Sequence, residues 1–217
     1  MNVSHIYAGN PLDRGDHERR DEQLMAEYAS ATSSKFLPLM DLSVLVSGDQ
    51  QERLGWLGVD DVRRLGADGR TLFLGLLEGA ACFVVDVTGQ AEAVQNLRAG
   101  DGYQFVDGRT VTQFLSAADS GIVAQARAQV SWHARAGFCS ACGHETFVKR
   151  GGQVRQCSNC EIEHYPRTDP VVITVVSDGE RALLGQSRGR LSRTRTYSAL
   201  AGFVDQGESI EEAVARE

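Results

Sequence analysis

The sequence predicts an α+β protein arranged as three successive parts. Short apolar runs of strand length mix with helical patterns over residues 1–135, and four cysteines gather within residues 136–165. Residues 166–217 contain a predicted strand hairpin, 169–176 with 182–186, followed by a glycine-containing loop and the start of a helix. Irregular mixing of strands and helices is typical of the α+β class, and clustered cysteines usually mark a small separate module.

Composition and charge limit the kind of protein this is. The 217 residues are 42% hydrophobic and 24% charged, which is ordinary for a globular protein and excludes a disordered chain. The net charge of −7 argues against nucleic-acid binding by bulk electrostatics, since that needs clustered Lys and Arg, so a small-molecule ligand is the better expectation. No apolar stretch approaches the roughly 18 residues of a membrane span, and the polar N-terminus lacks a signal-peptide core. We therefore expect a cytoplasmic protein without membrane contact.

The N-terminal part opens with a polar segment and two short strands. Residues 13–27 are predicted to form an exposed or partly ordered helix. The apolar runs 36–40 and 42–46 predict strands. Because proline has no N–H for a ladder hydrogen bond, Pro38 implies a sheet edge or a break in the first strand.

The rest of this part is predicted to contain a hairpin and a long helix. Residues 71–77 and 80–87 are strand-like, and the Glu-Gly pair between them supplies the turn. Apolar residues at helical spacing predict an amphipathic helix over 117–135, with Asp119 or Ser120 as its N-cap. No motif in this part identifies a function.

The five cysteines are unevenly distributed, and the distribution indicates their chemistry. Cys82 stands alone in an apolar run, where a buried inert thiol is expected. The other four form two CxxC pairs separated by fourteen residues: Cys139, Cys142, Cys157 and Cys160. In a cytoplasmic protein such pairs indicate a metal far more often than a disulfide, although redox-active thiols are an alternative.

The two CxxC pairs predict a structural zinc site, because four thiolates at one point favour tetrahedral zinc. Gly143 suits the positive φ of a tight turn, and residues 149–152 suit the tip of a hairpin that brings the pairs together. His144 and His164 lie beside the turns and are alternative ligands, but we interpret them as surface histidines, since four cysteines complete the shell. A closed shell leaves no position for water, so the chemistry must lie elsewhere. By itself this segment would suggest a nucleic-acid or protein interaction module.

The chain from Gly202 onward, GFVDQGESIEEAVARE, combines a loop with a capped helix. Ser209 followed by Glu212 is a capping box, which predicts a helix from Ile210. The buried stripe of this helix is predicted to comprise Ile210, Ala213 and Val214.

Charged residues of this helix are the candidate catalytic groups. Glu217 lies at the end of the second turn, where its carboxylate can face the loop and hold a hard divalent cation. Arg216 can pair with Glu212 and also reach back to Glu208, bracing the loop against the helix. The alternative interpretation is an exposed helix with ordinary ion pairs.

These positions resemble the first part of the Nudix box: Gly202, five residues, Glu208, seven residues, then Arg216 and Glu217. The Nudix family continues the box with two further acidic residues, which would follow Glu217. We therefore expect the chain to be a fragment that ends inside its catalytic motif and is inactive as given.

The order of parts resembles the zinc-ribbon-containing NADH pyrophosphatases of that family. The resemblance implies a divergent Nudix-like domain over 1–135, a zinc ribbon over 136–165 and a truncated Nudix α/β/α sandwich over 166–217. It also implies an enzyme that hydrolyses the pyrophosphate of NADH or NAD to nicotinamide mononucleotide and AMP with Mg or Mn. Some members also remove an NAD cap from RNA. The alternatives are a Nudix hydrolase of another nucleoside diphosphate derivative such as ADP-ribose, or a ribbon module without catalysis.

Catalytic residues follow from the resemblance position by position. It implies that Glu217 is a ligand of the catalytic Mg or Mn. It gives the backbone carbonyl of Ala201 a metal-binding role as well. Glu208 and Arg216 complete the catalytic set.

The resemblance also implies substrate contacts. Tyr165 and Phe203 match aromatic residues that stack on nicotinamide, with Tyr165 acting across a homodimer, and Arg109 is near a position that contacts phosphate or ribose. The chain departs from some relatives at Gly151 and Gly152, where a substrate-contacting carboxylate can occur. That contact is therefore not expected here.

Overall fold

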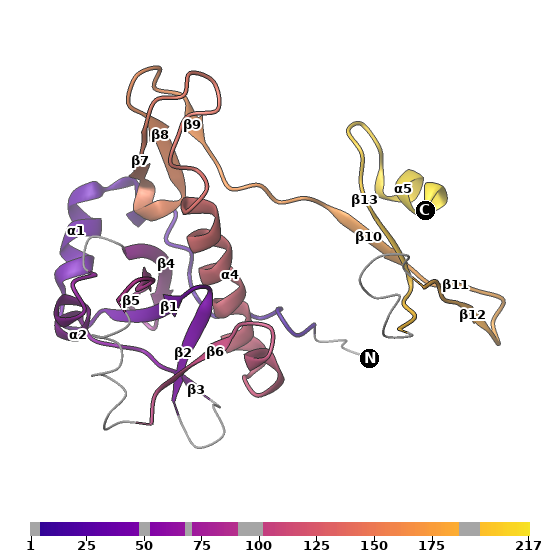
Figure 1. The fold of residues 1–217 in the computed structure, drawn as a ribbon, viewed down its shortest axis with the longest axis horizontal. Helices are drawn as coiled ribbons and strands as arrows, with labels where there is room; N and C mark the ends of the chain where they lie inside the picture. Colours follow the sequence, from indigo (N-terminus) through magenta and orange to yellow (C-terminus); the bar gives the residue numbers. More distant parts are fainter. Residues whose placement is uncertain (1–4, 48–52, 68–70, 91–101, 187–195) are drawn as a thin grey trace. The chain divides into compact units, whose positions relative to one another are not determined.

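The computed structural model describes residues 5–47, 53–67, 71–90, 102–186 and 196–217. The chain divides into two compact units, Met1–Pro166 and Arg167–Glu217. Figure 1 shows the elements of both, and each unit is described by itself. The mixture of helices and sheets confirms the α+β class. Among the described residues, no helix has both the length and the apolar character to cross a membrane.

The elements have the following bounds. Helical segments of the first unit include η1 (Glu18–Arg20), α1 (Glu22–Ser30), α2 (Val59–Arg64), η3 (Val111–Gln113), α4 (Ala117–His133) and η4 (Arg150–Gly152). Its strands include β1 (Lys35–Met40), β2 (Ser43–Ser47), β3 (Arg53–Leu54), β4 (Thr71–Leu77), β5 (Ala80–Asp86), β6 (Gln104–Asp107), β7 (Thr146–Lys149), β8 (Val154–Cys157) and β9 (Glu163–His164). The second unit contains β10 (Val171–Thr174), β11 (Val176–Ser177), β12 (Ala182–Leu183), β13 (Leu200–Phe203) and α5 (Ile210–Arg216).

A mixed sheet forms the centre of the first unit. Its order is β3-β2-β1-β5-β4, and β6 also pairs with β2. β1 runs parallel to β5, and the other pairs are antiparallel. The structure confirms the predicted strands at β1 and β2 and the predicted hairpin of β4 and β5.

The prediction that Pro38 marks a sheet edge or a break is wrong, because β1 lies between β2 and β5. The strand pairs with β5 along most of its length. On its other side, among the described residues, it pairs with β2 at Leu39 and Met40 and forms a bridge from Phe36 to Leu57. Pro38 falls between these two stretches of pairing, where its missing N–H removes no ladder bond.

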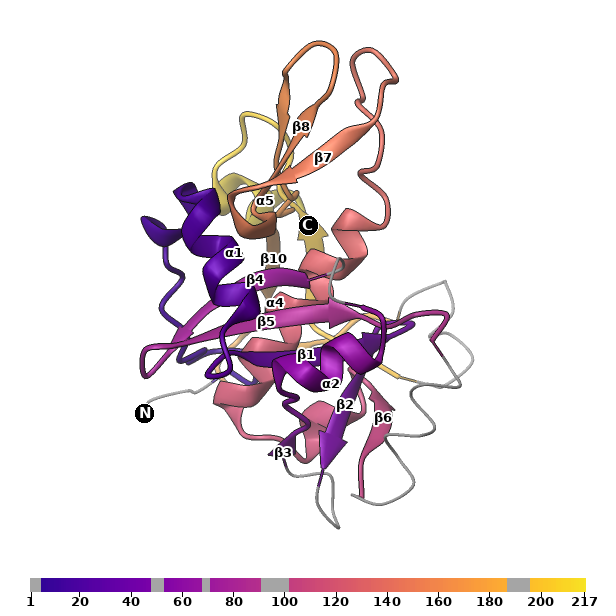
Figure 2. The ribbon, with the colours of Figure 1, turned by 90° about the vertical axis from the view of Figure 1, so that its left-hand side faces the viewer.

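Helices cover both faces of this sheet (Figure 2). α4 packs on one face, where Ile122 and Ala126 join Leu37 in one buried cluster. α1 and α2 pack on the other face, where Met25 joins Phe36 in a second cluster. Neighbouring residues of β1 thus enter opposite layers of the core, as the pleat of a strand requires.

Two predicted helices differ from the structure at their N-termini. Residues 13–27 do not form one helix, because η1 precedes α1 and the Asp21 side chain caps the latter. α4 begins after Ser116 rather than at Asp119 or Ser120, since the Ser116 hydroxyl oxygen accepts a hydrogen bond from the Asp119 N–H at 3.0 Å. Several neighbouring residues could serve as caps, so the periodic pattern alone does not select one.

The second unit is built from two short antiparallel pairs and a helix. β11 pairs with β12, which confirms the predicted hairpin, but β10 pairs with β13 instead of continuing into that hairpin. α5 packs against β10 and β13. The two elements that flank the β13–α5 loop are therefore packed against each other, which fixes both ends of the loop.

The cysteine segment forms a three-stranded antiparallel sheet, β7-β8-β9, within the first unit. The predicted hairpin tip is confirmed at η4, which contacts β4, η1 and α1. His133, at the end of α4, has its Nε2 2.7 Å from the Gly152 carbonyl oxygen and its Nδ1 3.0 Å from Nη1 of Arg155. Arg155 also donates to Thr146, from Nε to Oγ1 at 2.7 Å and from Nη2 to the carbonyl oxygen at 2.6 Å.

These contacts require a neutral His133. An arginine guanidinium only donates, so Nδ1 must accept the bond from Arg155, and Nε2 must carry the proton that the Gly152 carbonyl accepts. A second proton on the ring would remove the acceptor and place two donors face to face. Burial lowers the pKa of His133 below its ordinary value of 6.5, and the nearby charge of Arg155 acts in the same direction.

We predict that His133 makes the first unit less stable in acid. Its pKa in the folded chain is below the unfolded value of 6.5, so its stabilisation is fully present above that pH and is lost as the pH falls towards the folded pKa. The free energy of unfolding in urea, measured with zinc present between about pH 7.5 and 6, should fall more steeply for the wild type than for His133→Gln. Glutamine can make both hydrogen bonds but does not titrate. Equal slopes would contradict the prediction.

Candidate functional site

Four cysteine sulfurs converge where the two turns of the ribbon meet. All four Sγ atoms lie within 4.8 Å of one another: those of Cys139, Cys142, Cys157 and Cys160. The Cys142–Cys157, Cys142–Cys160 and Cys139–Cys160 separations are 3.4, 3.5 and 3.7 Å. Tetrahedral zinc with bonds of about 2.3 Å would separate its sulfurs by about 3.8 Å. The four side chains therefore fit a structural zinc ion with little movement.

Backbone hydrogen bonds shape the two turns. The Cys139 N–H donates to the His144 carbonyl at 2.8 Å, and the Gly143 N–H donates to the Cys139 carbonyl at 2.9 Å. Gly143 has φ 76°, which confirms the positive φ expected there. In the second turn, the N–H groups of Cys160 and Asn159 approach the Cys157 sulfur at 3.5 and 3.4 Å and lower the pKa of that thiol to about 6. Such donors favour the thiolate that a metal needs.

The two histidines beside the turns differ in position. His144 is exposed, with Nδ1 3.2 Å from the Cys142 carbonyl oxygen, which confirms the surface interpretation. His164 is half-buried, and its Nε2 lies 3.3 Å from the Cys139 sulfur. The surface interpretation therefore holds only in part for His164, because strand β9 places one side of its ring against the first turn.

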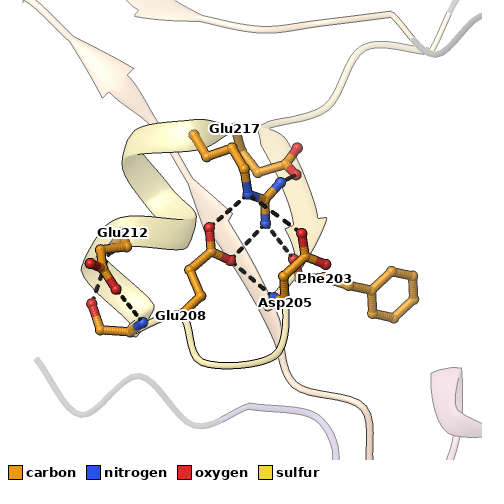
Figure 3. A network of polar contacts seen from close by, with 7 residues as sticks. Phe203, Asp205, Glu208, Glu212 and Glu217 are labelled. Carbon is orange, nitrogen blue, oxygen red and sulfur yellow. Dashed lines mark hydrogen bonds and ion pairs between the residues drawn. The ribbon is translucent and has the colours of Figure 1, made fainter.

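In the second unit, the guanidinium of Arg216, the last residue of α5, lies at the centre of a hydrogen-bond network that holds the loop preceding this helix (Figure 3). Its Nε and Nη2 donate to the two carboxylate oxygens of Glu208 at 2.7 and 2.9 Å. Nη2 also donates to the Phe203 carbonyl at 2.8 Å, and Nη1 donates to Glu217 at 2.5 Å. The Asp205 N–H adds a bond of 2.9 Å to Glu208. One guanidinium thus joins the strand end, the loop and the helix.

The capping box is confirmed, and it explains why one predicted ion pair is absent. Ser209 accepts from the Glu212 N–H at 3.2 Å, and the Glu212 carboxylate accepts from the Ser209 N–H at 2.7 Å. The predicted pairing of Arg216 with Glu212 is wrong, because that carboxylate faces the N-terminus of the helix. The predicted buried stripe is confirmed at Ala213 and wrong at Ile210 and Val214, which are 65% and 37% exposed. The helix begins at Ile210, as predicted.

Glu217 lies directly over Gly202. A Cβ atom at Gly202 would stand 2.0 Å from the Glu217 Cδ, so only glycine leaves room for this carboxylate. Ala201 precedes Gly202 in β13 and pairs with Ile173 of β10. The glycine that opens the motif therefore has a steric role.

The predicted substrate contacts lie in both units. In the second unit, Phe203 is 65% exposed and its ring points away from the Arg216 cluster (Figure 3). It lines an open cavity of about 540 Å³ together with Arg167 and Gln206. In the first unit, Tyr165 is exposed and its hydroxyl donates to Glu163. Arg109, also in the first unit, is exposed on the loop after β6.

Sequence reasoning missed two contributors to this site. Asp205 donates its N–H to Glu208, and its carboxylate lies 4.0 Å from Arg216. Its position three residues before Glu208 could have indicated this role, because an Asp before a Gly-containing turn often forms hydrogen bonds that fix the conformation of the loop. The Phe203 carbonyl gave no signal, since a backbone acceptor is independent of residue type.

We expect about one zinc ion per chain on the four sulfurs, because the cluster satisfies the geometry of a structural site. Metal analysis of protein prepared without chelator should give this value, and a double Cys157→Ser, Cys160→Ser variant should lose the metal. Cys82→Ala is the control, since Cys82 is fully buried in the core and lies outside the metal-binding group found among the described residues. Less than half an equivalent in the wild type, or zinc retained by the double variant, would overturn the assignment.

Two family models match adjoining parts of the first unit. The NADH pyrophosphatase-like rudimentary NUDIX domain matches residues 33–132. The NADH pyrophosphatase zinc ribbon domain matches residues 134–165. The second match covers all four clustered cysteines.

Curated relatives extend the similarity into the second unit. The NAD-capped RNA hydrolase of Schizosaccharomyces pombe is 31% identical over 261 residues, which cover 99% of this chain and 69% of that protein. The chloroplastic Nudix hydrolase 19 of Arabidopsis thaliana is 38% identical, over 76% of this chain and 41% of its own length. The NAD-capped RNA hydrolase NudC of Stutzerimonas stutzeri is 38% identical, over 40% of this chain and 31% of its own length. The chain thus matches less than half the length of the last two relatives.

The similarity to the Schizosaccharomyces pombe protein runs through both units, and it agrees with the sulfur cluster of the first and the braced loop of the second. Because that relative is matched over more than two thirds of its length, the similarity is not confined to the ribbon. The chain belongs to the zinc-ribbon-containing NADH pyrophosphatases of the Nudix hydrolase family.

Proposed function

We propose that this protein hydrolyses the pyrophosphate bond of NADH or NAD to nicotinamide mononucleotide and AMP. The observation that carries the proposal is the Glu217 carboxylate, which Arg216 holds over Gly202 at the start of the Nudix box. The names of two relatives, both NAD-capped RNA hydrolases, support a substrate that contains NAD. Removal of an NAD cap from RNA is the same bond cleavage on a longer substrate, and we include it in the proposal.

Cleavage of a phosphoanhydride by water needs positive charge at the phosphate oxygens and an activated water. Bound Mg or Mn would supply both, and we propose Glu217 and the Ala201 carbonyl among its ligands, because hard cations prefer oxygen. A carboxylate has about four lone-pair sites, so Glu217 can hold a cation while it still accepts from Arg216. We propose that Glu208 and Arg216 act by positioning Glu217.

The exposed aromatic residues support a dinucleotide substrate. We propose that Phe203, beside its open cavity, and Tyr165 stack on the nicotinamide ring. Tyr165 would come from the second copy of a homodimer. We propose Arg109 for a contact on the phosphate or ribose side, since its exposed cation suits an anion.

We predict that the full-length protein converts NADH to equal amounts of nicotinamide mononucleotide and AMP only when Mg or Mn is added. Glu217→Gln should lower the rate by at least about a hundredfold, because it removes a metal contact made in the transition state. Separation of the products by chromatography measures both. Release of free nicotinamide, or an unimpaired Glu217→Gln protein, would defeat the mechanism. Turnover of ADP-ribose alone would keep the mechanism and replace the substrate, whereas no metal-dependent turnover would favour a ribbon interaction module.

A second prediction concerns the space above Gly202. In Gly202→Ala the new Cβ would lie 2.0 Å from the Glu217 Cδ, so the carboxylate must move. We expect the affinity for Mn²⁺ and the rate of NADH hydrolysis each to fall by about tenfold or more. Gly137→Ala is the matched control, since its Cβ would meet nothing within 4 Å. Wild-type Mn²⁺ affinity in Gly202→Ala would contradict the role given to this contact.

A further inference from the structure

In the zinc ribbon, a histidine side chain contacts a cluster sulfur in a way that neither coordination nor the proposed reaction uses. The Nε2 of His164 lies 3.3 Å from the Cys139 sulfur. This contact is shorter than four other nitrogen–sulfur contacts of the cluster. The backbone N–H donors of Ala141, Asn159 and Cys160 stand at 3.4, 3.4 and 3.5 Å, and the Asn159 side chain at 4.0 Å. The contact joins the first turn to β9, the strand that follows the second turn.

The direction of this hydrogen bond follows from the chemistry of coordination. Zinc binds the thiolate form of cysteine, so a coordinating sulfur carries no proton and can only accept. The proton between Cys139 and His164 must then reside on Nε2. A neutral imidazole carries one N–H, and here that N–H faces the sulfur.

The location of Cys139 makes this donor important. Zinc with four thiolates has a net charge of −2, which hydrogen-bond donors spread over a larger volume. Cys142 is exposed, and water can donate to it. Cys139 is 4% exposed, so water has little access and protein groups must supply its donors. The Ala141 N–H supplies one, and His164 supplies the other.

We propose that His164 is a positioning residue of the zinc centre, donating its Nε2–H to the Cys139 thiolate. The bond raises zinc affinity by stabilising the charged sulfur, and it fastens β9 to the first turn of the ribbon. It acts on the residue next to Tyr165, so the metal also helps to place an aromatic side chain assigned to the substrate. This last step rests on the proposed function, whereas the hydrogen bond does not.

The experiment measures zinc affinity by competition with a chromogenic chelator in the full-length protein. His164→Ala should bind zinc about tenfold or more weakly, as expected when an outer hydrogen bond to a ligand is lost. His164→Gln should recover part of the affinity, because its amide can donate in a similar position. His144→Ala is the matched control: it removes an exposed histidine beside the same turn that contacts a carbonyl and no sulfur. It should bind zinc as the wild type does.

Three outcomes would overturn the proposal. Wild-type affinity in His164→Ala would show that the bond contributes nothing, and equal loss in His164→Gln and His164→Ala would assign the effect to packing. The third outcome concerns the visible absorption of the Co²⁺-substituted protein. If the wild-type spectrum is that of one nitrogen and three sulfur ligands and changes in His164→Ala, His164 is a ligand. An unchanged four-sulfur spectrum supports a donor. None of these readouts involves NADH, so failure here and failure of the proposed hydrolysis are separate results.

Discussion

The zinc ribbon buries too little apolar surface to hold its shape without the four sulfur atoms. Within residues 138–165, all of which are described, the buried hydrophobic residues are Cys139, Val154 and Cys157. Phe138, Phe147 and Ile162 are exposed in the same segment. A segment of this size normally needs a metal or a disulfide to offset the entropy of ordering the chain. A zinc ion on the four sulfurs would supply that crosslink, and it would help to maintain the contact of η4 with the end of α4 and the contact of β9 with the first turn.

The second unit fixes its loop by charge. The guanidinium of Arg216 and the N–H of Asp205 lower the pKa of Glu208 to about 2, and the pKa of Arg216 is raised in return. The pair therefore stays ionised at any pH at which the protein would work. It is solvent-accessible, so its contribution to stability is screened, and its main effect is geometric. Two fixed oxygens and one carbonyl hold the guanidinium in one orientation, and that orientation determines where Glu217 lies.

Features that depend on neighbouring residues could be predicted from the sequence, whereas contacts between distant parts of the chain could not. The zinc turns, the capping box at Ser209 and the positive φ of Gly143 depend on neighbouring residues, so spacing alone revealed them. The central place of Pro38 in the sheet could not be predicted, because it depends on strand partners that are remote in the chain. The position of His164 beside the cysteine turns could be predicted from its spacing, but its hydrogen bond to the Cys139 sulfur, 25 residues away, could not. The steric role of Gly202 could not be predicted either, because it depends on the packing of the end of α5 against β13, which no local pattern encodes.

The two sites differ in what they leave free for a ligand. Four thiolates would saturate a zinc ion, so that centre serves the fold. Glu217 gives one oxygen to Arg216 and keeps lone pairs that a hard cation can use. A chain of charge −7 repels the phosphates of a dinucleotide, and a cation on Glu217 would offset that repulsion. Arg167, which lines the Phe203 cavity, offers less positive charge than a divalent ion, since it is paired with Asp169 at 2.8 Å. A divalent ion held by Glu217 would therefore bring the substrate to this protein as well as activate the water that cleaves it.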